Sequence, residues 1–120
     1  MKTILVVEDN PDNMVLVDEI LEDEGFRVLQ ASTAEAGIVQ LDSEDVDLVL
    51  MDISLPRMSG LEAIRIIKAN NATRDIPVIA LTAHAMQTDR DKALAAGCND
   101  FLTKPINEDE LIAAMQEQLN

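Results

Sequence analysis

The sequence predicts one α/β domain, residues 1–120, in which helices cover both faces of a five-stranded parallel sheet. Two observations predict this fold class. Short apolar runs rich in Val, Ile and Leu recur along the chain, and such runs are typical of strands buried on both faces. Helical patterns with start and stop signals separate these runs, and no Pro-, Gly- or Ser-rich linker divides the chain. Strands and helices therefore alternate within a single domain.

The first strand is predicted at residues 4–7 and the first helix after Asn10. Pro11 suits the first helical position, where its missing N–H costs nothing. Gly25 supplies a left-handed residue that ends the helix. The apolar residues of this helix share one face: Met14, Val17 and Leu21.

A weaker strand is predicted at residues 27–30. The helix that follows it, near residues 34–41, can be capped by Ser32 or Thr33. The third strand is the apolar run 46–51, which a single Asp interrupts.

The third helix is predicted to begin within Ser59-Gly60-Leu61-Glu62, because Ser59 and Glu62 have the spacing of a capping box. Gly60 is interpreted as the residue that lets this helix approach a loop closely. The fourth strand is the run 78–81.

The fourth helix, roughly residues 86–95, is alanine-rich, so we expect it to be the least firmly packed. A weak strand at 100–103 precedes the last helix. That helix is predicted to start at Asn107, with acidic residues in its first turn, where the helix dipole favours anions. Its buried stripe is expected at Leu111, Met115 and Leu119.

Right-handed crossovers place helices on both faces of such a sheet. Composition does not choose the strand order. Of the two common orders, five strands favour 2-1-3-4-5, the doubly wound, flavodoxin-like arrangement, whose switch point lies between the first and third strands.

Composition argues against several classes of function. The chain has 9 basic and 23 acidic residues, a net charge of −14, which repels phosphate backbones and anionic lipids. No apolar run reaches the ~20 residues of a membrane helix, and no secretory leader opens the chain. Cys98 is the single cysteine, so no internal disulfide can form. We therefore expect a cytoplasmic protein that binds neither nucleic acid nor membrane.

Chemically active residues gather at the carboxyl edge of the predicted sheet, where ligands of such sheets bind. In chain order they are Glu8, Asp9, Asp52, Thr82 and Lys104. Three carboxylates brought close together repel one another, and a hard divalent cation such as Mg²⁺ relieves the repulsion. The hydroxyl and the ammonium group can bind phosphoryl oxygens. This edge therefore predicts a site that holds a phosphoryl group beside a carboxylate.

Each of these residues also has a plainer explanation. Acids directly after a buried strand are expected where the chain reaches solvent. Thr82 can be a strand-end hydroxyl and Lys104 a solvated lysine. Asp52 is the strongest single candidate, because an acid that closes the apolar run 48–51 gains nothing from its neighbours. The constellation as a whole favours a functional site.

These residues lie in motifs that resemble the CheY-like response-regulator receiver family across almost the whole chain. The matching stretches are Val7-Glu8-Asp9-Asn10, Leu50-Met51-Asp52-Ile53, Leu55-Pro56, Ser59-Gly60, Leu81-Thr82-Ala83 and Thr103-Lys104-Pro105. The resemblance implies that Asp52 is the phosphoacceptor. It also implies that the phosphodonor is the phosphohistidine of a histidine kinase or a histidine phosphotransfer protein.

The resemblance assigns roles to the other residues of the site as well. The implied ligands of Mg²⁺, or of Mn²⁺ in its place, are Glu8, Asp9, Asp52 and the backbone carbonyl of Ser54. Thr82 and Lys104 are implied to bind the phosphoryl oxygens.

A switch made of Thr82 and Phe101 is also implied. Phe101 stands where tyrosine is commoner in the family, so an inward or outward flip of its ring would be recognised by shape alone. The resemblance implies a cis Lys104-Pro105 peptide bond, whereas X-Pro bonds in general favour trans. His84 is expected at the rim of the site, where its bulk can restrict water.

Within the family, residues 8–14 and the Gly97-Cys98 pair are similar to DivK, a single-domain receiver of cell division. We expect a stand-alone, monomeric receiver that is not an enzyme but contributes to its own phosphorylation and dephosphorylation. It would signal to a downstream protein target by phosphorylation-dependent contacts, or pass the phosphoryl group on in a phosphorelay.

Three other functions suit the same fold. An aspartyl-phosphate hydrolase usually has a second acid two residues after the nucleophile, where this chain has Ser54. A flavodoxin-like FMN carrier needs a phosphate loop and a stacking ring, and Trp and Tyr are absent. A receiver-like fold can also act through fixed contacts without phosphorylation, which the intact constellation argues against.

Overall fold

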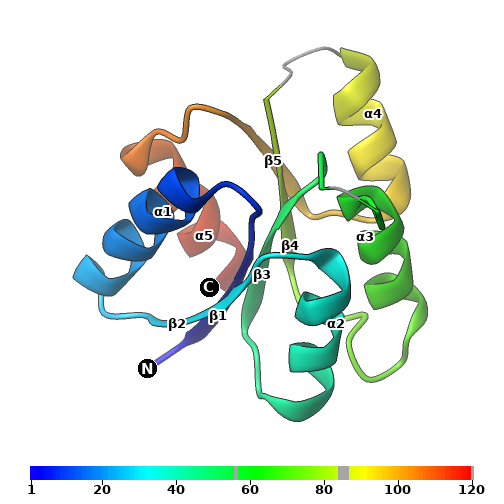
Figure 1. Cartoon of the computed structure of the whole chain (residues 1–120), viewed down its shortest axis with the longest axis horizontal. Helices are drawn as coiled ribbons and strands as arrows, with labels where there is room; N and C mark the ends of the chain where they lie inside the picture. The colour runs from blue at the N-terminus through cyan, green and yellow to red at the C-terminus, as the bar shows by residue number, and fades with distance from the viewer. Residues whose placement is uncertain (56, 84–86, 120) are drawn as a thin grey trace.

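The computed structural model describes residues 1–55, 57–83 and 87–119, and within them five strands alternate with five helices (Figure 1). The strands are β1 (Thr3–Val7), β2 (Arg27–Ala31), β3 (Leu48–Asp52), β4 (Val78–Thr82) and β5 (Asp100–Thr103). The helices are α1 (Pro11–Asp23), α2 (Ala34–Ser43), α3 (Gly60–Ala69), α4 (Gln87–Ala96) and α5 (Glu108–Leu119).

The strands form one parallel sheet in the order β2-β1-β3-β4-β5, as the sequence predicts. Val7 at the end of β1 lies beside Met51, the residue before Asp52 in β3. Thr82 at the end of β4 lies beside Thr103 at the end of β5. Because these strands end level with one another, the residues that follow them meet at a single edge.

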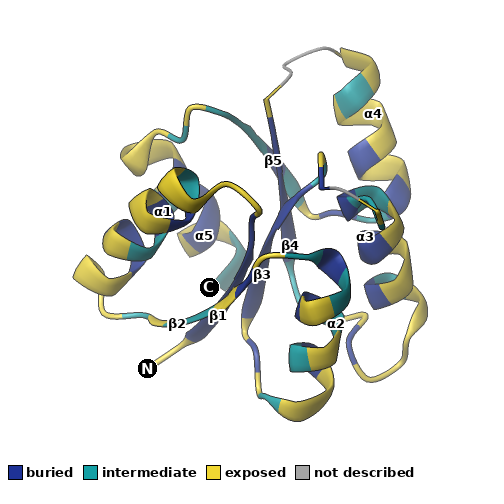
Figure 2. Cartoon of the chain, viewed as in Figure 1, coloured by how far each residue is buried: buried dark blue, intermediate teal, exposed yellow. Residues whose placement is uncertain are grey.

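Helices cover both faces of the sheet: α1 and α5 lie on one face, and α2, α3 and α4 on the other (Figure 1). Every residue of β1, β3 and β4 is buried (Figure 2). Successive strand side chains therefore enter two different apolar cores. In β1, Ile4 and Val6 face the α1–α5 core, and Leu5 and Val7 face the other.

α1 begins where the sequence predicts. The side-chain oxygen of Asn10 accepts hydrogen bonds from the backbone N–H groups of Asp12 and Asn13, at 2.9 and 3.2 Å. Pro11 is the first residue of the helix. Beyond its end, Gly25 has a φ of +86°, the left-handed conformation that favours glycine.

The start of α3 packs against the backbone at the end of β3. Ser59 Oγ accepts a hydrogen bond from the N–H of Glu62 at 3.2 Å. Gly60 is buried, and a Cβ there would overlap the carbonyl oxygen of Asp52 and the Cα of Ile53. The close approach predicted for Gly60 is therefore made to the last residue of β3 and the residue after it.

The last two helices differ in the size of their buried residues. In α4, only Ala93 and Ala96 are buried, fewer residues than in each of the other described helices, which agrees with the prediction that this helix is the least firmly packed. In α5, Ala114 joins Leu111 and Met115 in the buried stripe. Leu119, predicted for this stripe, is only half-buried because it lies at the end of the helix.

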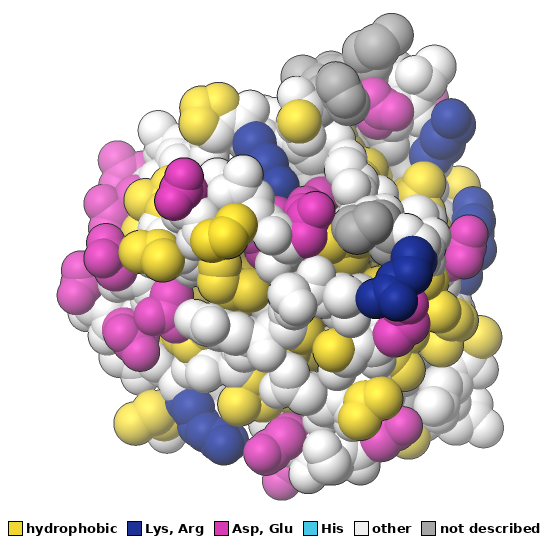
Figure 3. Space-filling view, viewed as in Figure 1, with side chains coloured by type: hydrophobic (Ala, Val, Ile, Leu, Met, Phe, Trp, Pro, Cys, Tyr) yellow, Lys and Arg dark blue, Asp and Glu magenta, His cyan; other side chains and the backbone are white. Residues whose placement is uncertain are grey.

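The surface around α1 is strongly acidic (Figure 3). The acidic residues of this helix are Asp12, Asp18, Glu19, Glu22 and Asp23. Among the described residues, no helix has the length and apolar character needed to cross a membrane.

Candidate functional site

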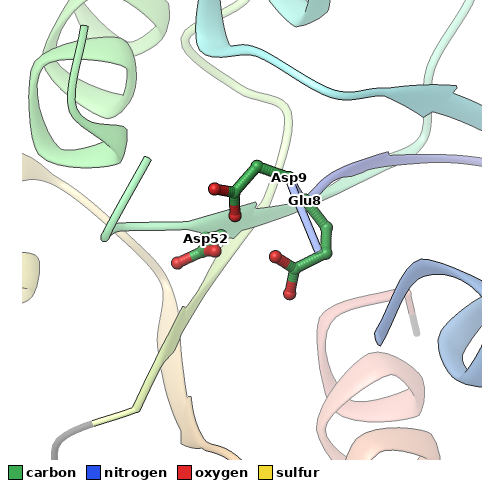
Figure 4. Close-up of side chains that lie close together, drawn as sticks. All are labelled: Glu8, Asp9 and Asp52. Atoms are coloured by element: carbon green, nitrogen blue, oxygen red, sulfur yellow. The ribbon is translucent and has the colours of Figure 1, made fainter. Parts of the chain in front are cut away.

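Three carboxylates converge at the carboxyl edge of the sheet (Figure 4). Glu8 and Asp9 directly follow β1, and Asp52 ends the neighbouring strand β3. One ligand oxygen from each lies within 4.8 Å of the others. Glu8 and Asp52 are each only 2% exposed, whereas Asp9 is open to solvent. The cluster therefore has two buried acids and one accessible acid.

Lys104 neutralises part of this charge. Its Nζ lies 3.0 Å from Asp52 Oδ2 and 2.5 Å from Glu8 Oε1, and its side chain is 14% exposed. Lys104 follows β5, and its backbone N–H donates a hydrogen bond to the carbonyl of Thr82 at 2.7 Å. The peptide bond between Lys104 and Pro105 is cis, as the resemblance implies.

Backbone N–H groups of the adjoining loops orient the two buried acids. The N–H of Ser54 donates to Asp52 Oδ1 at 2.8 Å. The N–H of Asn10 donates to Glu8 Oε2 at 3.2 Å. Both oxygens of Asp52 therefore have a donor, one from the β3–α3 loop and one from Lys104.

The electrostatics of the site are those of a crowded, buried group of acids. Burial, followed by a side-chain hydrogen bond to Asp52, raises the pKa of Glu8 to about 7, although Lys104 and the Asn10 N–H oppose the rise. Burial by itself would lower the pKa of Lys104, but the Glu8 and Asp52 carboxylates outweigh it and hold that pKa above its ordinary value. Ionising all three acids is therefore costly while one ammonium group is their cation.

The other residues predicted for the site lie in β4, in β5 and in the turn after β3, except for His84. Thr82 is the last residue of β4 and is 1% exposed, and its carbonyl accepts the hydrogen bond from the backbone N–H of Lys104. Ser54 lies in the turn after β3. Phe101 lies within β5 and is 8% exposed, in the core beneath α4. His84 lies outside the described residues.

A cavity of about 320 Å³ opens beside the acids. It is lined by Glu8, Asp9, Pro11, Met14, Gln30, Ala31 and Ser32. The sequence reasoning did not include Gln30 and Ser32 in the site. The strand order was the signal that could have found them, because β2 pairs with β1 and its end adjoins Glu8.

This arrangement suits a divalent cation and an anionic group held together. Three carboxylates and one ammonium leave an excess of negative charge, and oxygen ligands of this kind suit Mg²⁺. A group of oxygens bearing negative charge could then bind between the cation, Lys104 and the Thr82 hydroxyl.

Comparison with known proteins agrees with this geometry. The family model described as "Response regulator receiver domain" matches residues 4–116. The chain is 42% identical over 111 residues to the sensor protein GacS of Pseudomonas syringae pv. syringae, covering 90% of this chain and 12% of GacS. It therefore spans about an eighth of that relative. A 14.6 kDa protein of Leptolyngbya boryana is 41% identical over 114 residues, which cover 95% of this chain and 87% of that protein.

A solved structure adds a metal to the comparison. The receiver domain of the sensor histidine kinase PA1611 of Pseudomonas aeruginosa PAO1 has a TM-score of 0.91 and 38% identity. The alignment covers 98% of this chain and 97% of that one. The PA1611 structure has a magnesium ion coordinated in its active site cleft.

Proposed function

The chain belongs to the response regulator receiver family, and on this basis we propose that Asp52 accepts a phosphoryl group from a phosphohistidine in a Mg²⁺-dependent reaction. A receiver domain is a phosphoacceptor signalling module rather than an enzyme in the usual sense. The observation that carries the proposal is the contact of Lys104 with Asp52, at 3.0 Å, inside a cluster of three carboxylates.

The residues present fit a hard divalent cation. The proposed ligands of Mg²⁺, or of Mn²⁺ in its place, are Glu8, Asp9, Asp52 and the backbone carbonyl of Ser54. When bound, the cation would neutralise the carboxylates and the oxygens of the incoming phosphoryl group. The magnesium ion in the PA1611 receiver supports this assignment.

In the proposed step, a carboxylate oxygen of Asp52 forms a bond to phosphorus while the bond from phosphorus to the donor histidine nitrogen breaks. The nitrogen keeps the electron pair of the broken bond. The N–H of Ser54 holds the carboxylate in place by its hydrogen bond to Oδ1. Lys104 is close enough to Asp52 to transfer its hydrogen bond to a phosphoryl oxygen, and Thr82 would donate to another. Thr82 and Phe101 would together form the switch of the receiver.

The aspartyl phosphate is lost by hydrolysis, in which a water oxygen bonds to phosphorus while the bond from phosphorus to the Asp52 oxygen breaks. Asp52 leaves as a carboxylate, and the protons of the water go to the phosphate product and to solvent. We propose that the same residues contribute to this step, so the phosphorylated form has a finite lifetime. His84 would limit the approach of water from the rim.

The proposed partners are proteins. The phosphodonor would be a histidine kinase or a histidine phosphotransfer protein, and the output a downstream protein target or a further relay step. The net charge of −14 supports a monomeric module that does not bind nucleic acid or anionic membranes. We propose that this module acts in the cytoplasm. The 14.6 kDa relative supports a single-domain form.

The test is phosphorylation by a small phosphodonor. The protein is incubated with acetyl phosphate and Mg²⁺, and its intact mass is measured with and without EDTA. We expect one added phosphoryl group on the native protein, none on Asp52→Asn and none with EDTA. Asp45→Asn, which removes an exposed carboxylate, is the matched control and should be phosphorylated normally.

Equal labelling of Asp52→Asn and the native protein would disprove the role of Asp52. Steady turnover of diverse phosphate esters would indicate a hydrolase, and a yellow, flavin-loaded preparation would indicate an FMN carrier.

A further inference from the structure

The two ends of α4 are attached to the protein in different ways. Its buried residues, Ala93 and Ala96, lie in the second half of the helix. In the first half, Gln87, Thr88 and Arg90 are exposed. Apolar packing therefore holds the end of α4 more firmly than its start.

The segment after α4 is fixed by a lysine from α3. Lys68 Nζ donates hydrogen bonds to the carbonyl of Ile76 at 2.7 Å and to Asn99 Oδ1 at 2.9 Å. Asn99 Oδ1 also accepts a hydrogen bond from the N–H of Val78 at 2.9 Å. Gly97, with a φ of +112°, lies so close to the Lys68 side chain that a Cβ would be 2.9 Å from Lys68 Cγ. The end of α4 is thus tied to α3 and to the start of β4.

In the first half of α4, Arg90 lies over the aromatic ring of Phe101. The guanidinium carbon of Arg90 lies 5.7 Å from the centroid of the Phe101 ring, within the range of a cation–π contact. Phe101 is buried in the same core as Ala93 and Ala96. In the part of the chain that the structure describes, Arg90 forms no ion pair.

This contact is close to the phosphorylation site along the chain. Only residues 83–86 connect Thr82, the last residue of β4, with the start of α4. On the other side, Phe101 lies three positions before Lys104. Thr82 and Lys104 therefore each lie a short length of chain away from one partner of the Arg90–Phe101 contact.

We propose that Arg90 is a positioning residue that holds the start of α4 against β5 through the face of the Phe101 ring, while Lys68 and Asn99 fix the other end. Release of Arg90 lets the first half of α4 swing away about Gly97 and exposes the ring. The inference rests on the proposed function and deepens it, because Phe101 is one of the two residues proposed for the switch.

The aromatic composition of the chain provides a clean test. Phe26 and Phe101 are its only Phe residues, and Trp and Tyr are absent, so fluorophenylalanine labelling gives two ¹⁹F signals. Phe26 packs in the opposite core and serves as the internal control. A soluble paramagnetic probe then measures the exposure of each ring from the relaxation of its signal, in the unphosphorylated protein.

Arg90→Gln should raise the exposed population of Phe101 by roughly two- to fivefold, the equilibrium effect of an exposed cation–π contact. Arg90→Lys, which keeps a cation, should leave the exposed population of Phe101 close to its native value. Lys92→Gln removes the same charge from an exposed position of α4 and should leave Phe101 unchanged. The Phe26 signal should be the same in all variants.

Hydrogen exchange gives the second readout: in Arg90→Gln, amides in the first half of α4 should exchange severalfold faster than in the native protein, while those near Gly97 keep their rates. Unchanged Phe101 exposure in Arg90→Gln would overturn the proposal, as would an equal change in Lys92→Gln. Both measurements omit Mg²⁺ and phosphodonor. A result that disproves the role of the Arg90–Phe101 contact is therefore distinguishable from a failure of Asp52 to be phosphorylated.

Discussion

At the scale of single residues, Glu8 is the carboxylic acid of the site whose pKa is raised by its surroundings. It is 2% exposed, contacts Lys104, and has a pKa raised to about 7 by burial and by its hydrogen bond to Asp52. Its ionisation state therefore changes in the physiological pH range, and a bound cation would favour the ionised form.

The raised pKa of Glu8 predicts how stability depends on pH in the absence of metal. Because the folded state binds this proton more tightly than the unfolded state, the stabilisation is complete below pH 4.5 and is lost as pH rises through about 7. Over this range Glu8 should account for a loss on the order of 2–3 kcal/mol. Urea unfolding in EDTA between pH 4.5 and 8 measures it. Glu8→Gln should remove this dependence of the free energy of unfolding on pH. The same pH dependence in Glu8→Gln as in the native protein would contradict the assignment.

Lys104 provides a second prediction. Lys104→Met removes the cation that competes with Mg²⁺ for the carboxylates, so Mg²⁺ should bind roughly tenfold more tightly, while phosphorylation of Asp52 falls sharply. Calorimetry and intact-mass measurements give the two quantities. Lys92→Met removes an exposed lysine of α4 and should alter neither. Weaker Mg²⁺ binding in Lys104→Met would show that the lysine does not compete with the cation.

His84 gives a kinetic prediction that rests on the sequence alone. His84→Ala should shorten the lifetime of the aspartyl phosphate severalfold, because a smaller side chain admits water. The decay of phosphorylated protein after removal of the phosphodonor measures this lifetime. An unchanged decay rate would dismiss the role.

Asp52 and Lys104 could be proposed from the sequence, because each follows or ends a recognisable strand and the strand order brings them together. The N–H donors of Asn10 and Ser54 could not be predicted, because they depend on the path of two loops. The pKa of Glu8 could not be predicted either, since it depends on how deeply the side chain is buried.

At the scale of elements, local signals predicted most helix starts correctly. Ser59 accepts the capping hydrogen bond predicted for it, and Asn10, after which the first helix was predicted to begin, also accepts one. Asn107, predicted as the start of the last helix, accepts a hydrogen bond from the N–H of Glu110 at 3.0 Å and lies one residue before α5. The cation–π attachment of α4 could not be predicted, because Arg90 and Phe101 carry no pattern that pairs them.

The contact of α3 with β3 predicts a large effect from a small substitution. Gly60→Ala should lower the free energy of unfolding by about 1–3 kcal/mol, because its Cβ would overlap the backbone of Asp52 and Ile53. Chemical denaturation measures the loss. Gly37→Ala is the comparison: its Cβ would meet side-chain methyl groups of Val7 and Ala31 rather than backbone, so its cost should be smaller. Equal losses would show that the backbone contact is not limiting.

At the scale of the whole molecule, fold and net charge act together. The parallel order of the sheet was predictable, since alternation and right-handed crossovers leave few arrangements. A net charge of −14 repels itself in the compact state, and the acids that converge at one edge concentrate this repulsion.

Mg²⁺ should therefore stabilise the whole fold. At a hundred times its dissociation constant, an ion that binds only the folded state adds about 2.7 kcal/mol, which thermal unfolding detects. NaCl at equal ionic strength should give a smaller shift. Asp9→Asn, which changes an exposed residue of the cluster, should reduce the shift caused by Mg²⁺. An equal shift from both salts would indicate charge screening alone.

The separation of the two apolar cores by the sheet has a consequence for engineering. Within the described residues, the cores share no side chain, so substitutions beneath α1 and beneath α4 should have additive effects on stability. Chimaeras could exchange one helical layer between related chains and retain the other.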